Sequence, residues 1–501
     1  MATTRLDTGL RLAFYGDDFT GSTDALEVLA FAGLRCALFL SVPSAQTLRT
    51  LGPFDAIGIA GASRGMSPAE MVSELPTVLR ALARLPTVLV HYKVCSTFDS
   101  SPSIGSIGQV MDLARDAFGN GVIPIVGGTP ALSRYCAFGN LYARSGTDDQ
   151  VHRLDRHPIM GTHPITPMTE ADLARHLSAQ TAQKIAKFTL PSFAGGRDAM
   201  DLELTRIVAD APDAILFDSA TPEHLTEVGR MVEALSNSRS SPLFSVGSSG
   251  LEYAMTQWWR ESIAPSEVAV GPAADHESFE AVPQVLAVSG SASLLSALQI
   301  DAAISAGFID LSVDAAALVA SSDWQVGLDS LVDQAICGLR AGKSVMLHTA
   351  RGPHDPRIEA MIDALMLGGA TRAEAKHAGG RLLGQRMGQI VEQVLRTVPL
   401  RRLILSGGDT SSQITQQLAP DALLIAARLA PGAPLCRVVS QAPHLRHLQI
   451  ALKGGQMGQP DYFVKALRGT ALGADSHPLN GLRLPNPLLL PLPLTVFKSP
   501  T

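Results

Sequence analysis

The feature that most constrains the fold of this chain is a regular alternation of short apolar runs with amphipathic segments. Runs such as AIGIAG from Ala56, TVLVHYKV from Thr87 and VIPIVGG from Val122 have the length and composition of buried β-strands. Between several of these runs lie stretches with helical periodicity, for example residues 68–85 and 220–235. Strands that alternate with helices predict an α/β fold in which the sheets are largely parallel.

A break in this pattern divides the chain into two parts. Residues 262–283 are rich in proline, alanine and acidic residues and show no sustained period, which is typical of an interdomain linker. A chain of 501 residues is also too long for one ordinary hydrophobic core. We therefore predict two α/β domains, one at residues 1–265 and one at residues 280–469.

Residues 470–501 have a composition of their own. The segment LPNPLLLPLPLTVFKSPT is rich in leucine and proline, and its prolines exclude a regular helix or a central strand. We expect a loosely ordered tail. The alternative is a strap that covers an apolar patch of the protein.

Charge and cysteine content exclude several classes of protein. A net charge of −6 without a long Lys/Arg run argues against a nucleic-acid partner but not against a small anionic ligand. The 5 cysteines are scattered and form no CxxC pair, so a zinc site or a disulfide framework is not expected, and a reducing cytoplasm fits. The N-terminus lacks the apolar core of a signal peptide, and no run reaches the ~18 apolar residues of a membrane span. We expect a cytoplasmic protein without a membrane partner, and the sequence allows a homo-oligomer.

Three turns at the ends of N-terminal strands carry charged side chains. The turn GDDFTGS holds Asp17 and Asp18, the next holds Ser63 and Arg64, and the third begins at Lys93. Ligands of open α/β sheets bind outside the carboxyl ends of the strands, so these turns are expected to share one pocket. A guanidinium can clamp a carboxylate and an ammonium can add positive charge, which suits a small polyhydroxylated acid.

The presence of two adjacent aspartates, Asp17 and Asp18, in one turn has to be explained. Two neighbouring carboxylates repel each other, and burying either one without a partner is costly. A purely structural turn is served well by one Asp or Asn. The pair therefore favours a chemical role, and a helix-capping turn is the alternative.

Three Gly/Ser-rich loops mark the C-terminal part. SGSAS and GGDTSSQI each follow an apolar run and precede a helical segment, and LKGGQMG follows a third run. Small residues let backbone N–H groups approach a phosphate, and a helix N-terminus adds a favourable field, although such turns are often only helix caps. Three of them together predict a nucleotide site. Its residues are Ser289, Ser291, Gly407, Gly408, Asp409, Thr410, Lys453, Gly454 and Gly455.

In their order and spacing, these landmarks resemble the four-carbon acid sugar kinase family over residues 12–467, nearly the whole chain apart from the tail. The resemblance implies an ATP-dependent kinase of small sugar acids, with the acid held by the N-terminal domain and ATP with Mg²⁺ by the C-terminal domain. It also implies an active site in the cleft between the domains. The sequence itself identifies no metal ligands.

One segment departs from the family pattern. Where the family has K-x-D-S-T-x-R-G, this chain has KVCSTFDSSPSIGSIG, so that Cys95 stands in place of the aspartate and the later arginine is missing. Together with RLDRHPIMGTHPITPM from Arg153, this resembles the branch that phosphorylates 3-oxo-isoapionate. The family's other acids include 3-oxo-tetronate, threonate and erythronate.

In a kinase, Asp17 and Asp18 can divide the work. One carboxylate orients a substrate hydroxyl while its neighbour accepts the proton as phosphoryl transfer proceeds. Two other functions stay open. A lyase or isomerase of hydroxy acids would use one of the aspartates as a base without nucleotide, and a non-catalytic sensor would bind the acid through Arg64 and Lys93.

Overall fold

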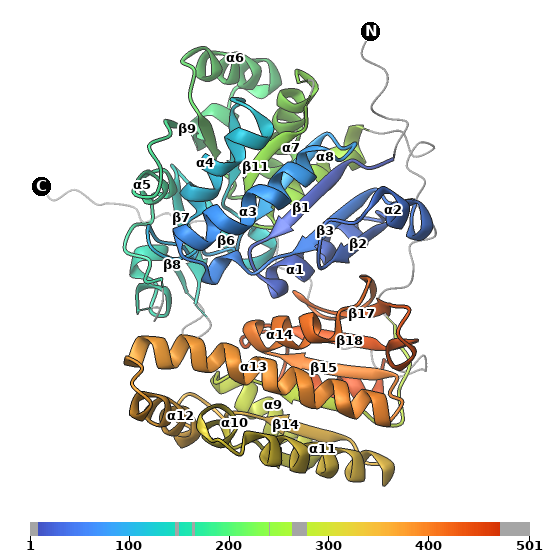
Figure 1. Cartoon of the computed structure of the whole chain (residues 1–501). Helices are drawn as coiled ribbons and strands as arrows, with labels where there is room; N and C mark the ends of the chain where they lie inside the picture. The colour runs from blue at the N-terminus through green and yellow to red at the C-terminus, as the bar shows by residue number, and fades with distance from the viewer. Residues whose placement is uncertain (1–8, 146–149, 163–165, 240, 263–277, 471–501) are drawn as a thin grey trace, which may run out of the picture.

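The computed structural model describes residues 9–145, 150–162, 166–239, 241–262 and 278–470, which form two lobes stacked on each other (Figure 1). Within these residues one sheet of 15 strands runs through both lobes. In spatial order its strands are β13 (Ile309–Ser312), β14 (Val345–His348), β12 (Leu286–Ser289), β15 (Arg402–Ser406), β18 (Gln449–Lys453), β17 (Ala433–Val439), β16 (Ala422–Ala430), β2 (Cys36–Phe39), β3 (Ala56–Ala60), β1 (Leu12–Gly16), β4 (Leu89–Lys93), β11 (Leu243–Gly247), β5 (Ile123–Val126), β10 (Ala214–Phe217) and β9 (Ile185–Phe188).

Within the main sheet, the eight strands of the N-terminal lobe, from β2 to β9 in the spatial order above, are all parallel. Helices cover both faces of this part of the sheet, which explains why strands such as β1 and β4 are buried at every position. One face packs against α1 (Phe19–Phe31), α6 (Gly196–Ala209), α7 (Pro222–Asn237) and α8 (Gly250–Ser262). The other packs against α2 (Ala45–Leu51), α3 (Pro68–Ala83), α4 (Ile107–Phe118) and α5 (Leu173–Ser178).

A second, antiparallel sheet follows β5 and consists of β6 (Arg134–Ala137), β7 (Asn140–Arg144) and β8 (Val151–Arg153). It is attached to the main sheet through a bridge between Cys136 and Ser219, the latter lying just after β10. The small sheet therefore stands at the carboxyl ends of the N-terminal strands.

The C-terminal lobe repeats the layered arrangement on a smaller scale. Strands β13, β14, β12, β15 and β18 are parallel. One face carries α10 (Ala315–Ala320), α11 (Trp324–Arg340), α12 (Pro356–Leu367), α13 (Arg372–Thr397) and α14 (Gly408–Leu418). The other carries α9 (Leu294–Ser305) and α15 (Tyr462–Arg468).

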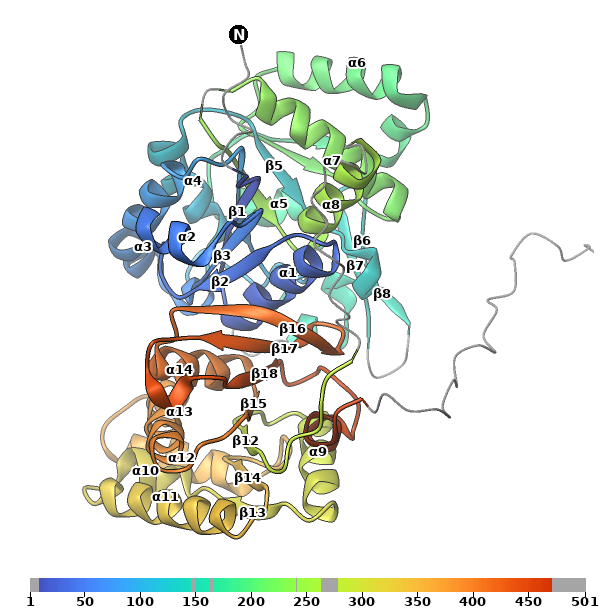
Figure 2. The same ribbon diagram turned by 90° about the vertical axis from the view of Figure 1, so that its right-hand side faces the viewer.

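The lobes are joined by an antiparallel hairpin of β16 and β17, which lies between them in Figure 2. Strand β16 pairs with β2 at Leu423 and Leu38, so the separate sheets expected from the sequence are continuous. The α/β class and the largely parallel strands are confirmed. Most of the expected linker and nearly all of the tail lie outside the described residues. No helix within the described residues has the length and apolar character needed to cross a bilayer.

Candidate active site

The order of the strands brings three sequence-distant turns together. Strand β1 lies between β3 and β4, and all three run in the same direction. Their carboxyl ends therefore place Asp17, Arg64 and Lys93 side by side. The backbone N–H of Asp17 donates to Lys93 O at 2.8 Å, and that of Arg64 donates to Asp17 O at 3.0 Å.

The guanidinium of Arg64 holds both aspartates. Its Nε and Nη2 donate to the two carboxylate oxygens of Asp17 at 3.1 and 2.8 Å, while Nη1 donates to Asp18 Oδ2 at 2.7 Å. This answers why two carboxylates can lie side by side here, because one planar cation is shared between them. Arg64 is thus engaged by two protein carboxylates.

The two aspartates differ in environment. The Asp17 side chain is 3% exposed and that of Asp18 is 21% exposed. Burial raises the pKa of Asp17, an effect that Arg64 opposes and Asp18 reinforces. Asp18 is the N-cap of α1, and its Oδ1 accepts the backbone N–H of Gly21 at 2.6 Å. Asp18 therefore caps α1 through one carboxylate oxygen while part of its side chain is accessible to solvent.

Lys93 is buried beside this pair. Its ammonium lies 3.4 Å from Asp24 Oδ2, and a Cβ atom placed on Gly21 would be 3.1 Å from Lys93 Nζ and 2.5 Å from Asp18 Oδ1. Burial by itself would lower the pKa of Lys93, but Asp24, Asp18 and Asp17 raise it overall. The site accordingly contains three carboxylates and two cations, and the pKa of both cations, Arg64 and Lys93, is raised by the neighbouring carboxylates.

Ser63, predicted as a substrate contact, lies beneath the turn that carries Arg64. Its side chain is fully buried, and its hydroxyl is 2.8 Å from the hydroxyl of Tyr92, whose ring stacks on Tyr15. Ser63 therefore supports the turn that carries Arg64.

The three Gly/Ser-rich loops of the C-terminal lobe also converge, because β12, β15 and β18 are neighbours in the sheet. Gly407 has φ of +110°, which favours glycine, and its N–H donates to Lys453 O at 2.9 Å. The hydroxyl of Ser293, the N-cap of α9, donates to Gly455 O at 2.6 Å. Helix α14 begins directly after Gly407, which as N-cap carries no side-chain cap. Its first N–H groups are therefore suited to an anion.

The predicted side chains of these loops fall into two groups. Asp409 is exposed, in the first turn of α14. Lys453, in contrast, is fully buried, and its Nζ donates to Ser406 Oγ at 2.8 Å. Burial lowers the pKa of Lys453 to about 7. The buried hydroxyl of Ser289 has no hydrogen-bond partner within the described residues.

The turns of the N-terminal lobe and the loops of the C-terminal lobe meet at the junction of the lobes. A Cβ atom placed on Gly408 would lie 3.4 Å from Thr20 Oγ1 and 3.8 Å from Asp18 Oδ2. One placed on Gly454 would lie 3.5 Å from Thr20 Cγ2. The N-terminus of α14 thus faces the N-terminus of α1, with Asp18 between them.

Sequence reasoning missed Arg134 in β6. Its backbone pairs with that of Thr129. The hydroxyl of Thr129 is 2.7 Å from that of Ser248, the residue directly after β11. The Arg134 Nε is buried without a hydrogen-bond partner among the described residues. Burial lowers the pKa of Arg134, and Cys95 and Asp99 raise it in part. The signal that could have found it is its position soon after the strand VIPIVGG.

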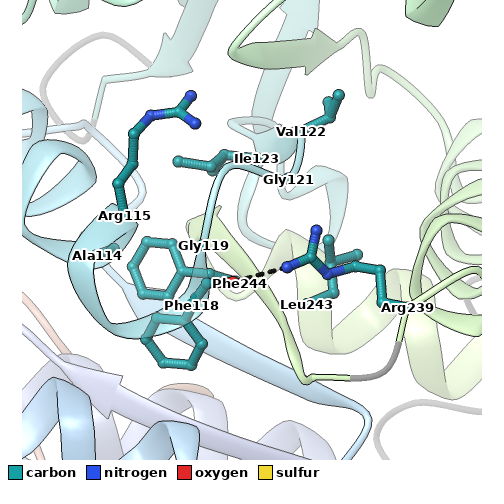
Figure 3. Close-up of a pocket in the computed structure, with 10 residues that line it drawn as sticks. All are labelled: Ala114, Arg115, Phe118, Gly119, Gly121, Val122, Ile123, Arg239, Leu243 and Phe244. Carbon is teal, nitrogen blue, oxygen red and sulfur yellow. Dashed lines mark hydrogen bonds between the residues drawn. The ribbon is translucent and has the colours of Figure 1, made fainter.

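A pocket elsewhere in the N-terminal lobe is unrelated to these residues (Figure 3). It lies at the amino ends of β5 and β11, the opposite edge of the sheet from Asp18, and Arg239 Nη2 donates across it to Phe118 O at 2.7 Å. Its cavity volume of about 10 Å³ leaves room for about one water molecule. It is therefore too small for a sugar acid.

Comparisons with known proteins follow the same division. Residues 12–255 match the model of a sugar-binding N-terminal domain, and residues 286–463 match that of a nucleotide-binding C-terminal domain. The chain is 41% identical over 470 residues to a 3-oxo-isoapionate kinase of Paraburkholderia graminis, covering 93% of this chain and 96% of that protein. The chain belongs to the four-carbon acid sugar kinase family. The family predicted from the sequence motifs is confirmed.

More distant members of the family agree. A 3-oxo-tetronate kinase of Pseudomonas fluorescens is 29% identical over 467 residues, with 92% of this chain and 97% of that protein covered. A solved structure from Salmonella typhimurium LT2 has a TM-score of 0.69 at 23% identity and covers 91% of this chain and 99% of that chain. A Haemophilus influenzae protein has a TM-score of 0.64 at 22% identity, with coverages of 91% and 98%. These two structures support the fold.

Proposed function

We propose that this protein is an ATP-dependent kinase that phosphorylates a hydroxyl group of a 3-oxo sugar acid, with 3-oxo-isoapionate as the first candidate and 3-oxo-tetronate as the second. The observation that carries the proposal is the approach of Asp18 and Thr20 to the N-terminus of α14. There a carboxylate that can accept a proton faces backbone N–H groups that can hold phosphate. The proposal places the reaction in the cytoplasm, where ATP is available.

The two aspartates are assigned different tasks. Asp18 is the general base, because it is the more exposed of the two and lies opposite Gly408. Asp17 is a positioning residue, since both of its oxygens accept from Arg64. Arg64 in turn fixes Asp18 through Nη1 and reduces the repulsion between the carboxylates. The acceptor hydroxyl would give its proton to Asp18 as its oxygen attacks the γ-phosphorus of ATP, and the bond from that phosphorus to the β,γ-bridging oxygen would break to release ADP.

ATP is assigned to the loops that contain Ser291, Gly407–Thr410 and Gly454–Gly455. Within the described residues no group of three or more His, Cys, Asp or Glu side chains forms a metal cage. Mg²⁺ in kinases is usually held by one or two carboxylates together with the nucleotide phosphates, and the exposed carboxylate of Asp409 fits that donor set. When bound, Mg²⁺ would offset the charge of the phosphates.

The acid is assigned to the carboxyl ends of β4 and β5, where Lys93 and Arg134 lie. Since Arg64 is already shared by two aspartates, a different cation is needed for the substrate carboxylate. Arg134 has no carboxylate within ion-pair distance in the part of the chain that the structure describes. Burial raises the pKa of the nearby Cys95 to about 12, so its thiol is neutral and does not compete for the cations.

Replacing Arg134 with glutamine is therefore expected to raise the KM for the acid about tenfold or more, because a charge-assisted hydrogen bond contributes roughly 1.5–3 kcal/mol. The KM for ATP should change little. Steady-state kinetics with each substrate varied in turn measures both. Arg156→Gln is the matched control, since that side chain is 80% exposed. An unchanged KM for the acid would indicate that Arg134 does not bind the acid and instead stabilises the sheet of β6, β7 and β8.

The proposed activity is tested by ADP release across a panel of 3-oxo-isoapionate, 3-oxo-tetronate, threonate and erythronate. We expect turnover only with ATP present and the highest kcat/KM with one of the two 3-oxo acids. Turnover without ATP would favour the lyase or isomerase. Binding of an acid without any turnover would favour the sensor.

A further inference from the structure

Helix α1 carries a row of side chains that face the C-terminal lobe. Thr20, Asp24, Glu27 and Phe31 are spaced by four, three and four residues, which places them on one side of the helix. Thr20 lies next to Gly408 and Gly454, as described above. The same helix begins at its N-cap Asp18. One rigid element therefore bears both the proposed base and a set of contacts between the lobes.

The most specific of these contacts is an ion pair. Arg428 Nε, on β16, donates to Glu27 Oε1 at 3.1 Å. The Arg428 guanidinium also lies over the ring of Phe31, 4.0 Å from its centroid. The Glu27 side chain is 6% exposed and that of Arg428 is 45% exposed. Arg428 is thus held on two sides by residues one turn apart on α1.

A second contact lies between Thr20 and this pair. A Cβ atom placed on Gly432, in the turn between β16 and β17, would be 4.0 Å from Asp24 Oδ1. The other oxygen of Asp24 faces Lys93. The β16–β17 hairpin therefore follows α1 from Phe31 towards the site.

From these contacts we propose that Glu27 and Arg428 are a positioning pair, which acts through α1 to hold Asp18 opposite the N-terminus of α14. The inference rests on the proposed kinase function. Neither residue needs to touch a substrate. The pair sets the distance between the proton acceptor in one lobe and the phosphate loops in the other, and a displacement of about 1 Å can cost roughly 10²-fold in rate.

The ion pair also responds to pH. Burial raises the pKa of Glu27 to about 7, with Asp24 adding to the effect and Arg428 opposing it. The other titratable groups that face Glu27 are Tyr253 on α8, Cys436 on β17 and Tyr462 on α15. Burial raises the pKa of each, so they stay neutral near pH 7. Above that pH Glu27 is charged and the ion pair is complete, whereas below it a neutral carboxyl faces Arg428.

The experiment uses the full chain with Glu27→Gln, Arg428→Gln and the double variant. We expect kcat at pH 8 to fall roughly 10- to 100-fold in each single variant. The double variant should be no slower than the slower single one, because both remove the same interaction. Binding of ATP alone, measured by calorimetry, should be unchanged. Glu203→Gln is the control, since it breaks the exposed Glu203–Arg206 pair of α6 and should keep wild-type kcat.

A pH series separates positioning from general stability. Glutamine resembles the protonated carboxyl, so the ratio of wild-type to Glu27→Gln kcat should be near one below pH 6 and rise as pH passes about 7. A ratio that does not change with pH, or additive losses in the double variant, would overturn the positioning pair. Wild-type kcat in Arg428→Gln, whose side chain is half-exposed and tolerant of change, would overturn it as well. If the wild-type protein itself shows no ATP-dependent turnover, it is the proposed function that fails.

Discussion

Asp18→Asn is expected to lower kcat by roughly 10²–10⁴-fold, the usual contribution of a general base. Asparagine keeps the shape of the side chain and can still accept the N–H of Gly21, so the cap of α1 survives. It loses the negative charge and the ability to take the proton of the acceptor hydroxyl. The KM for ATP should change by much less. Stopped assays of ADP release, with the melting temperature of the same protein, measure both effects.

Asp17→Asn provides the contrast. Asp17 is buried and accepts from Arg64 through both oxygens, so its loss frees the guanidinium and shifts Asp18 indirectly. We expect a smaller loss of kcat than in Asp18→Asn and a clear fall in melting temperature. Asp116→Asn, at an exposed position of α4, is the control for the substitution itself. If Asp17→Asn is the slower of two stable variants, the assignment of the base is reversed.

Much of the fold could be predicted because its evidence is local. The apolar run before Asp17 and the helical period after it identify β1 and α1 without knowledge of any partner. The pairing of β2 with β16 could not be predicted. It joins edge strands nearly four hundred residues apart through one bridge, at Leu38 and Leu423, and such a pairing leaves no periodic signal in either segment.

The site was predictable in its parts but not in its connections. Asp18, Arg64 and Lys93 follow strands that the sequence reveals, yet only the strand order shows that Arg64 is held by the aspartates rather than left free for a substrate carboxylate. The burial of Lys453 was equally hidden. A lysine after a strand and before two glycines looks accessible, but its side chain turns inward to Ser406. Interactions between side chains depend on tertiary packing, which spacing along the chain does not record.

Gly408→Val is expected to abolish measurable phosphoryl transfer while leaving the protein folded. A single Cβ at this position would be in ordinary contact with Thr20 Oγ1 at 3.4 Å and with Asp18 Oδ2 at 3.8 Å. The two further methyl groups of valine would enter the gap between the N-terminus of α14 and Asp18. In the proposed mechanism, the γ-phosphate meets the acceptor hydroxyl in that gap. We expect ATP affinity, measured by calorimetry, to fall along with activity.

Two further glycine substitutions make this result specific. Gly408→Ala adds only the atom that the gap accommodates, so it should retain more activity than Gly408→Val. Gly380→Val adds the same branched side chain to the exposed surface of α13, where a Cβ atom has no neighbour within 4 Å among the described residues. This variant measures how far a valine in a helix lowers the stability of the protein, and it should leave kcat unchanged. If Gly408→Val is folded and binds ATP with wild-type affinity, the N-terminus of α14 does not hold the phosphates, and the role of Asp18 as the facing base loses its main support.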